Sequence, residues 1–175
     1  VHPTLIPVRR LIANVEGVMN AIVVKGDAVG ATLYYGAGAG AEPTASSVIA
    51  DLVDVTRMQT ADPMHRVPTL SFQPDLLSDT PVIPMEDVET SYYLRMQVID
   101  KPGVMAEITR IVADNNISIS ALIQKEPGSD SDRVSIIMLT HLTVEKNINA
   151  AIARIESLPV VTNKVIRIRI EELNN

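Results

Sequence analysis

The sequence predicts an α+β fold, in which a β-hairpin and a helix precede a separate β-α-β-β-α-β sandwich. Apolar residues alternate along several short segments, which is typical of half-buried strands, and recur at helical spacing in three longer ones. Turn residues separate these segments. Five prolines between Met58 and Thr90 interrupt every regular pattern there, so that region joins two units.

The composition is that of a globular protein with a mainly aliphatic core. Hydrophobic residues make up 46% of the 175 residues and aromatic residues 3%. The absence of cysteine excludes disulfides, thiolate metal sites and cysteine nucleophiles, and fits a reducing compartment. No apolar run reaches the ~20 residues that cross a bilayer. We therefore expect a soluble, cytoplasmic protein that does not contact a membrane.

The charge pattern supports three segments: residues 1–57, 58–91 and 92–175. The first holds four basic and five acidic residues, the second one basic and six acidic, and the third ten of each. The net charge of −6 therefore lies mostly in the middle segment, a proline-rich acidic linker. Neither flanking segment carries the basic surface that binds nucleic acid.

The first segment predicts a hairpin followed by a glycine hinge and a helix. Strands are expected at 18–25 and 29–35, and a helix from Pro43 to about Arg57. A glycine hinge lets the backbone approach a ligand closely, and amides at a helix start favour negative charge. The hinge glycines are Gly36, Gly38 and Gly40, and the apolar helix face comprises Val48, Ile49, Leu52, Val53 and Val55. A hairpin and one helix make a poor independent domain, so this segment is expected to end something larger.

The third segment begins with a strand, a turn and a helix. Residues 92–99 alternate apolar and polar, and residues 100–103 form a turn. A helix is expected at 104–115, with Val104, Ile108, Ile111 and Val112 on one buried stripe. Strands at 117–126 and 133–141 should then flank a polar hairpin loop.

A second helix and a last strand complete the pattern. Thr143 is a candidate N-cap, and the buried face comprises Val144, Ile148, Ile152 and Ile155. In the last strand, 160–170, isoleucines alternate with Arg167 and Arg169, which we expect to be solvated, with a contact between subunits as the alternative. The order β-α-β-β-α-β is that of a ferredoxin-like sandwich. Its second sheet face should expose apolar residues and support a homo-oligomer: Ile119, Ala121, Ile137 and Leu139.

Two resemblances follow from these residues. Asp100-Lys-Pro-Gly-Val-Met-Ala after a strand and Asn116-Ile-Ser-Ile-Ser after a helix resemble an ACT domain, over residues 92–171. Ala13-Asn-Val-Glu-Gly-Val-Met-Asn-Ala-Ile22, Tyr34-Tyr-Gly-Ala-Gly-Ala-Gly and Pro43-Thr-Ala-Ser-Ser-Val resemble the C-terminal end of a homoserine dehydrogenase catalytic domain. The hairpin and helix are then the remnant of an α/β dehydrogenase catalytic domain.

The resemblance implies an oxidoreductase that uses NAD(P) to interconvert aspartate semialdehyde and homoserine. The glycine hinge would line the cleft near the nicotinamide and substrate. The cofactor contacts implied in this way are Gly36, Ala37, Gly38, Ala39, Glu42 and Thr44. The residues alone also fit a purely structural role, in which the glycines form a tight strand-to-helix turn packed on a core. Isolated glycine spacings are weak signals of a ligand site.

The sequence departs from that family in what it lacks. A Gly-x-Gly-x-x-Gly turn of a Rossmann unit is absent, and Lys25 matches none of the family's catalytic lysines. We therefore expect a C-terminal fragment without catalytic residues, inactive by itself and without tight NAD(P) binding. The alternative is a stand-alone dimeric ACT-type amino-acid sensor without catalytic activity.

The ACT resemblance implies an amino-acid effector, most often threonine. Amides at the helix start could take the ligand's carboxylate, and Asp100 could face its ammonium. The expected effector contacts are Asp100, Gly103, Val104, Met105 and Ser118. Equally, Asp100 could cap the helix, with Pro102 and Gly103 only turning the chain.

No metal site is expected. His2, His65 and His141 are far apart in sequence, and no two share a spacing typical of metal ligands. Asp51 and Asp54 fit a solvated helix face better than an acid/base pair.

Overall fold

The computed structural model describes residues 1–62, 72, 74–124 and 132–173. It divides into two compact units, which are considered separately. The sandwich unit comprises Val1–Pro7 and Val82–Asn174, and the hairpin unit is Val8–Pro81. Within the described ranges, no helix combines the length and apolar character needed to span a bilayer.

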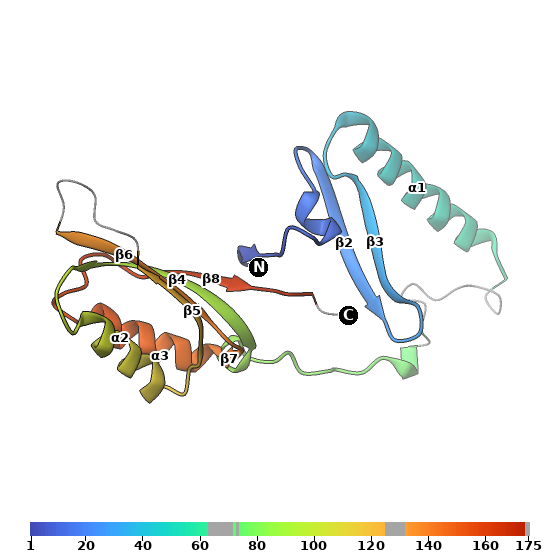
Figure 1. The fold of residues 1–175 in the computed structure, drawn as a ribbon. Helices are drawn as coiled ribbons and strands as arrows, with labels where there is room; N and C mark the ends of the chain where they lie inside the picture. Colours follow the sequence, from blue (N-terminus) through green and yellow to red (C-terminus); the bar gives the residue numbers. More distant parts are fainter. Residues whose placement is uncertain (63–71, 73, 125–131, 174–175) are drawn as a thin grey trace. The chain divides into compact units, whose positions relative to one another are not determined.

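The sandwich unit has the expected β-α-β-β-α-β order (Figure 1). Its sheet follows the order β1-β8-β4-β6-β5, and β7 pairs with β4 outside that path. The elements in chain order are β4 (Glu89–Ile99), α2 (Val104–Asp114), β5 (Ile119–Gln124), β6 (Arg133–Thr140), β7 (Thr143–Val144), α3 (Glu145–Glu156) and β8 (Ile166–Ile170). A short 3-10 turn, η4 (Met85–Asp87), precedes β4.

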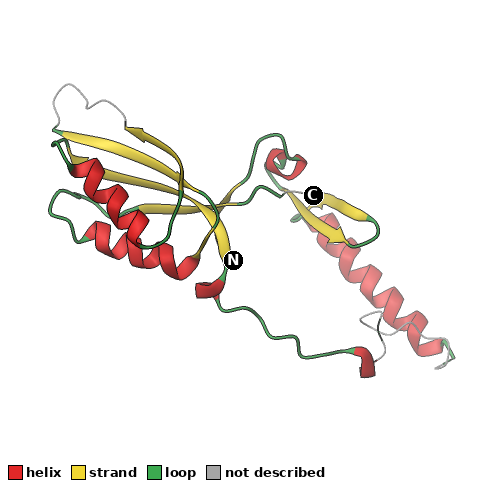
Figure 2. Cartoon of the chain, turned by 60° about the horizontal axis from the view of Figure 1, so that its bottom comes forward, coloured by secondary structure: helices red, strands yellow, loops and turns green. Residues whose placement is uncertain are grey.

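Helices α2 and α3 lie side by side on one face of this sheet (Figure 2). Alternation along β4 places Tyr92, Leu94, Met96 and Val98 against them, each at most 1% exposed. On α2, the four predicted stripe residues are the buried ones, because spacings of three and four residues return to one side of a helix. The ferredoxin-like prediction is therefore confirmed, and the core lies between helices and sheet.

The other sheet face, here called the open face, carries no helix in the described part of the sandwich unit. Strand register identifies its residues, because side chains paired across strands point to the same side. Tyr93 is opposite Leu139 and Ile168, and Leu139 is also opposite Ala121. The apolar open-face residues are Tyr93, Ala121, Ile123, Ile137, Leu139, Ile166, Ile168 and Ile170.

Three predictions about side chains in this unit were wrong. Ile119 is opposite buried Thr140 and packs against the core rather than on the open face, because a register shift separates it from Ala121. Thr143 is not an N-cap: it is buried in β7, and Val144 occupies the cap position without a side-chain hydrogen bond. Arg167 and Arg169 are not simply solvated: their side chains are 29% and 12% exposed, and both reach Glu145 on α3.

An edge strand that the sequence did not indicate completes the sheet. β1 (Thr4–Leu5) pairs in parallel with β8, with Thr4 opposite Arg169 and Leu5 opposite Ile170. The amide of Glu171 donates to the carbonyl of Leu5 at 3.0 Å. A two-residue strand has too little periodicity to be found in a sequence. Residues 1–7 therefore belong structurally with the sheet that follows 80 residues later in the chain.

The hairpin unit contains β2 (Met19–Gly26), β3 (Gly30–Ala37) and the long helix α1 (Ala41–Thr60), with 3-10 turns η1 (Leu11–Asn14) and η3 (Pro74–Leu76). The two strands pair along their whole length, from Met19 opposite Ala37 to Gly26 opposite Gly30. Two boundaries differ from expectation: β3 continues through Gly36, and α1 begins at Ala41 before Pro43. Proline fits there because the first turn of a helix needs no donated amide hydrogen bond.

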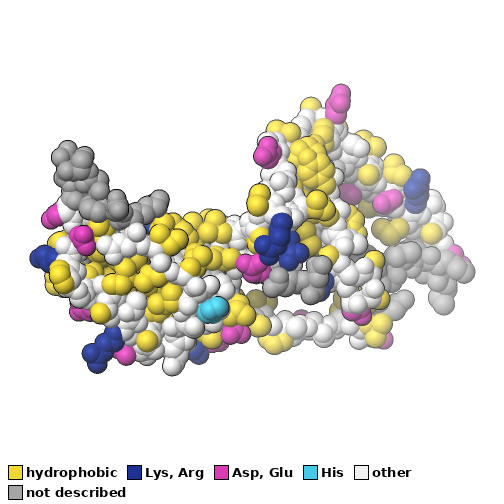
Figure 3. Space-filling model, in the orientation of Figure 1, with side chains coloured by type: hydrophobic (Ala, Val, Ile, Leu, Met, Phe, Trp, Pro, Cys, Tyr) yellow, Lys and Arg dark blue, Asp and Glu magenta, His cyan; other side chains and the backbone are white. Residues whose placement is uncertain are grey.

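Apolar side chains in the hairpin unit are largely uncovered. α1 has no buried residue, and the predicted apolar face is exposed, from 40% at Val53 to 58% at Ile49. In the hairpin, Ile22 and Tyr34 are 65% and 64% exposed and lie opposite each other. Space-filling atoms show hydrophobic side chains on the surface of this unit (Figure 3). Such surfaces mark contact sites for other protein surfaces.

Candidate functional sites

The glycine segment forms the junction of β3 and α1. Gly36 and Ala37 still belong to β3, so the hinge is confined to Gly38, Ala39 and Gly40. The amide of Gly38 donates to the carbonyl of Val18 at 3.2 Å. Gly40, with φ of 137°, takes the N-cap position of α1, and its carbonyl accepts from the amide of Thr44 at 3.1 Å.

Glycine at position 38 has a local steric reason. A Cβ there would lie 1.4 Å from Nδ2 of Asn20, on the neighbouring strand. The side chain of Asn20 therefore occupies the space that any other residue at 38 would need. This close approach explains why position 38 is a glycine without involving a ligand.

The six residues expected to contact cofactor lie between positions 36 and 44, and all are exposed. Gly36 and Ala37 end β3, Gly38 and Ala39 form the turn, and Glu42 and Thr44 lie in the first turn of α1. Small side chains leave the backbone of this segment open to close approach. Glu42 adds negative charge at the helix start, which makes that end of α1 less favourable for a phosphate.

At the second candidate site, Gly103 is the N-cap of α2 and adopts a left-handed conformation with φ of 93°. Val104 is buried in the core and Met105 packs partly against it. Asp100 does not cap the helix: its amide donates to the carbonyl of Asp132 at 2.8 Å, and its carboxylate accepts from Nε2 of Gln124 at 3.4 Å. Asp100 therefore remains near the start of α2 with an exposed carboxylate.

Ser118 lies away from the other expected effector contacts. Its carbonyl accepts from the amide of His141 at 2.9 Å, just past the end of β6. That end of the sheet adjoins Tyr92, whereas Asp100 follows Ile99 at the opposite end of β4. Seven residues of strand correspond to about 23 Å. Within one chain the structure groups Asp100 with Gly103, Val104 and Met105 but does not bring Ser118 to them.

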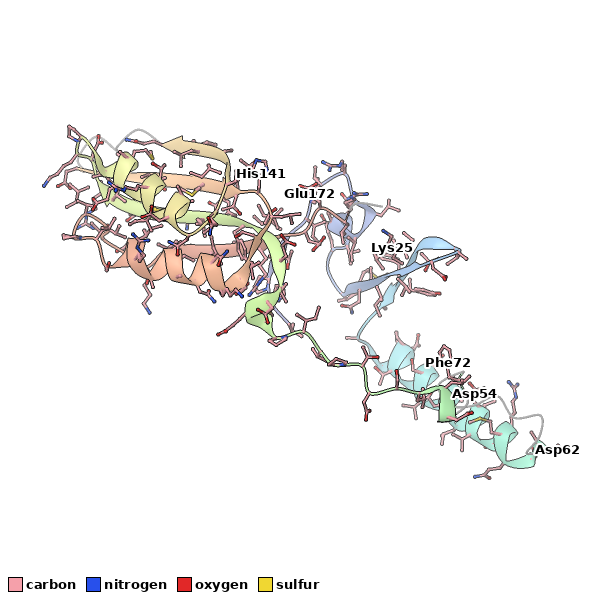
Figure 4. The ribbon with its side chains drawn as sticks, turned by 90° about the horizontal axis from the view of Figure 1, so that it is seen from below. Lys25, Asp54, Asp62, Phe72, His141 and Glu172 are labelled. Carbon is pink, nitrogen blue, oxygen red and sulfur yellow. The ribbon has the colours of Figure 1, made fainter. Side chains whose placement is uncertain are left out.

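The sequence predicts no metal site, because its three histidines are widely spaced. His141 projects from the sandwich unit (Figure 4), His2 precedes β1, and His65 lies outside the described residues. Lys25 is the last residue but one of β2 in the hairpin unit and is exposed (Figure 4). Among the residues that the structure describes, no three metal-ligating side chains cluster.

A buried charge cluster in the sandwich unit was missed by sequence reasoning. Glu145, whose side chain is 3% exposed, accepts from the hydroxyl of Tyr92 at 2.5 Å and from Nε of Arg169 at 3.0 Å. Arg169 adds a second bond through Nη2 at 2.5 Å, and Arg167 approaches the same carboxylate at 3.0 Å. The two arginines that alternate with isoleucines in the last strand were the available sequence signal of a buried charge cluster. Their partner, Glu145, lies on α3, far from them in sequence.

Electrostatics in this cluster favour an ionised glutamate. Burial alone would raise the pKa of Glu145, but hydrogen bonds from Tyr92 and Arg169 and the charges of both arginines outweigh it and lower the pKa. Burial, followed by the bond to Glu145, raises the pKa of Tyr92, which stays a neutral donor. With one anion and two cations, the cluster carries a net positive charge.

Comparison with known proteins relates these sites to a family. Residues 1–53 match the family model described as homoserine dehydrogenase, and residues 92–160 match the ACT domain. The chain combines a homoserine dehydrogenase segment with an ACT domain. It is 58% identical over 99% of its length to a homoserine dehydrogenase of Pseudomonas aeruginosa, and 53% identical over 100% to one of Neisseria gonorrhoeae, covering 40% of each.

A solved homoserine dehydrogenase supports the same assignment in three dimensions. The crystal structure from Thiobacillus denitrificans is 66% identical, with a TM-score of 0.88, over 99% of this chain and 38% of that one. The chain thus spans about 40% of the length of the curated relatives named above.

Proposed function

We propose that this chain supplies the closing part of the catalytic domain and the ACT regulatory domain of an NAD(P)-dependent homoserine dehydrogenase. The enzyme would be cytoplasmic and interconvert aspartate semialdehyde and homoserine. The observation that carries the proposal is 58% identity to a homoserine dehydrogenase over 99% of the chain. That similarity includes both the glycine segment and the whole sandwich.

In this proposal the glycine segment forms one wall of the nicotinamide and substrate cleft. Gly36, Ala37, Gly38 and Ala39 present backbone and small side chains to the ligand. Glu42 and Thr44, in the first turn of α1, flank it. A bound nicotinamide would supply the hydride for reduction, and these residues would help to position the reacting groups. The chain by itself is expected to be inactive and to bind NAD(P) weakly.

The exposed hairpin unit supports a role within a larger catalytic domain. Apolar residues of α1 and of the strand pair Ile22 and Tyr34 are largely exposed within the described part of the hairpin unit. Burying such side chains contributes about 1.5–3 kcal/mol each. A catalytic domain packed against them would stabilise this unit and provide the walls of the cleft.

A chimeric enzyme tests the proposal. Residues 1–175 would replace the aligned region of the Thiobacillus denitrificans homoserine dehydrogenase, and reduction of aspartate semialdehyde would be measured with NADPH and with NADH. We expect activity close to that of the unaltered enzyme. Gly38→Val should lower kcat/KM by at least about tenfold, because its side chain displaces Asn20 and the turn.

Gly17→Ala is the matched glycine control, because it lies outside the expected cleft and a Cβ there meets nothing within 4 Å; its φ of 63° adds a conformational cost of about 1–2 kcal/mol. A chimera that folds and assembles but reduces no aspartate semialdehyde with either cofactor would overturn the proposal.

We propose that the ACT domain binds an amino-acid effector, with threonine as the first candidate. We also propose that it assembles as a homo-oligomer through the open face. The match to the ACT family model over residues 92–160 supports the regulatory role. Apolar residues on the open face support assembly, since exposed patches of this kind mark interfaces.

A further inference from the structure

The start of strand β2 holds the glycine segment in two ways. The carbonyl of Val18 accepts from the amide of Gly38 at 3.2 Å. Asn20 is opposite Gly36 across the hairpin, so Gly38 is its diagonal neighbour, two residues further along the chain. The side chain of Asn20 occupies the space where a Cβ at position 38 would lie. One backbone hydrogen bond and one side chain therefore fix the place of Gly38 relative to β2.

The contact between Asn20 and Gly38 is steric rather than polar. Within the described ranges, the exposed carboxamide of Asn20 makes no hydrogen bond to another residue. Both Nδ2 and Cγ of Asn20 would collide with a Cβ at position 38, whereas the Cβ of Asn20 would be 3.3 Å from it. The branched end of the Asn20 side chain, and not its stem, therefore sets the position of Gly38.

Position 38 requires glycine because of this neighbour and not because of its backbone conformation. Positive φ occurs at Gly40 but not at Gly38, so an alanine could adopt the backbone of position 38. What excludes a side chain there is the carboxamide of Asn20. The two positions form one steric unit, in which a smaller residue at 20 makes room for a larger one at 38.

We propose that Asn20 is a positioning residue for the reduction of aspartate semialdehyde. The inference rests on the proposed function, in which Gly36 to Ala39 line the cleft. Asn20 fixes Gly38 and thereby the wall that this segment presents to the ligands. Rates depend steeply on such geometry, since a misplacement of about 1 Å can lower a rate about a hundredfold. Asn20 acts through the glycine segment and requires no contact of its own with substrate or cofactor.

Variants of the chimeric enzyme at position 20 test this role. Asn20→Ala removes the branched end of the side chain, so kcat should fall at least about tenfold while KM for aspartate semialdehyde stays within about threefold. Asn20→Asp keeps the branched shape and should retain kcat within about threefold. Val24→Ala is the matched control, because Val24 lies on the same strand and the same face, is 48% exposed and is four residues away from Asn20. It should leave kcat within about twofold.

A double-mutant cycle tests the steric unit itself. In the unaltered background, Gly38→Ala should lower kcat/KM at least about tenfold. In the Asn20→Ala background the colliding atoms are gone, so Gly38→Ala should lower kcat/KM by less than about twofold more. The same loss in both backgrounds would overturn the proposal. Circular dichroism and sedimentation establish that each variant folds and assembles, and the comparison of Asn20→Ala with Asn20→Asp serves if Gly38→Ala does not fold.

The remaining outcomes separate this proposal from the function on which it rests. An active chimera in which Asn20→Ala keeps full kcat, or loses no more than Val24→Ala, overturns the role of Asn20 and leaves the function intact. Equal losses in Asn20→Ala and Asn20→Asp overturn positioning by shape and assign the carboxamide a polar contact with a ligand instead. An unaltered chimera that is folded but inactive overturns the proposed function and the role of Asn20 together.

Discussion

At the scale of single residues, burial of Glu145 has to be compensated by its partners. A carboxylate at 3% exposure loses most of its hydration, which is unfavourable unless hydrogen bonds and opposite charges replace water. Tyr92, Arg167 and Arg169 replace it from two different strands. The cluster therefore joins α3 to β4 and β8 through one side chain.

Substitution of Glu145 should destabilise the sandwich unit strongly. Glu145→Gln leaves two arginines without their anion, and breaking a buried ion pair in this way costs about 3–5 kcal/mol. Urea unfolding followed by circular dichroism measures the change. Lys146→Ala is the matched control one residue along: its ion pair with Asp87 is 60% and 53% exposed, so the loss should stay below about 1 kcal/mol. Equal losses in the two variants would contradict this account.

The same cluster predicts how stability changes with pH. The pKa of Glu145 is lower in the folded than in the unfolded chain, so its contribution is fully present above the unfolded pKa of about 4.3. It is lost as the pH falls through the lowered folded pKa. The difference in unfolding free energy between the unaltered chain and Glu145→Gln should therefore shrink below about pH 4. Urea titrations at several pH values test this, and a difference that grows on acidification would disprove it.

Sequence reasoning failed at this cluster for a physical reason. Arg167 and Arg169 alternate with isoleucines, and alternation alone assigns them to one side of a strand without telling which side is covered. The sheet register decides that question, because Arg169 is opposite buried Tyr92. The isoleucines therefore take the open face and the arginines the helix face.

At the scale of elements, local patterns predicted most of the sandwich. Val104, Ile108, Ile111 and Val112 are spaced for one helical face, and all four are buried in α2. Capping was less predictable: Thr143 has a suitable side chain, but pairing of β7 with β4 takes it into the sheet. For the glycine segment, sequence indicated a turn before a helix, while the strand extension to Ala37 depends on pairing with Met19.

Gly103 should be required for its backbone conformation rather than for space. Its φ is 93°, and a Cβ there would meet nothing within 4 Å. Gly103→Ala should therefore cost about 1–2 kcal/mol in unfolding free energy, from the left-handed conformation alone. Gly103→Asn is the control, since asparagine tolerates this region better and should lose less. Urea unfolding measures both, and an equal or larger loss for asparagine would argue against a conformational cause.

Helix α1 should open far more readily than α2 in the 175-residue chain. No residue of α1 is buried, whereas four of α2 are in the core, and local opening is cheapest where few apolar contacts are lost. Amide hydrogen exchange should give protection factors at least about a hundredfold lower in 41–60 than in 104–114. Comparable protection in the two helices would show that α1 has stabilising contacts beyond those described.

At the scale of the whole molecule, the open face predicts self-association. Ile137 lies opposite Ile123 and Arg95 near the middle of this face. Ile137→Lys would place a charge in a buried interface, so it should weaken association by at least about tenfold, measured by sedimentation. Ala106→Lys, on the exposed outer side of α2, should leave association unchanged. A chain that is monomeric at all concentrations, or insensitive to Ile137→Lys, excludes this interface.

Strand β1 has a consequence for how this regulatory domain could be exchanged between proteins. A module that recombines freely is one contiguous stretch of gene, but this sheet is assembled from residues 1–7 and from residues 82 onward. A single cut before Val82 leaves β8 with an unpaired edge. Transplanting the domain into another enzyme therefore requires two insertions, and its inheritance should follow that of the segment carrying β1.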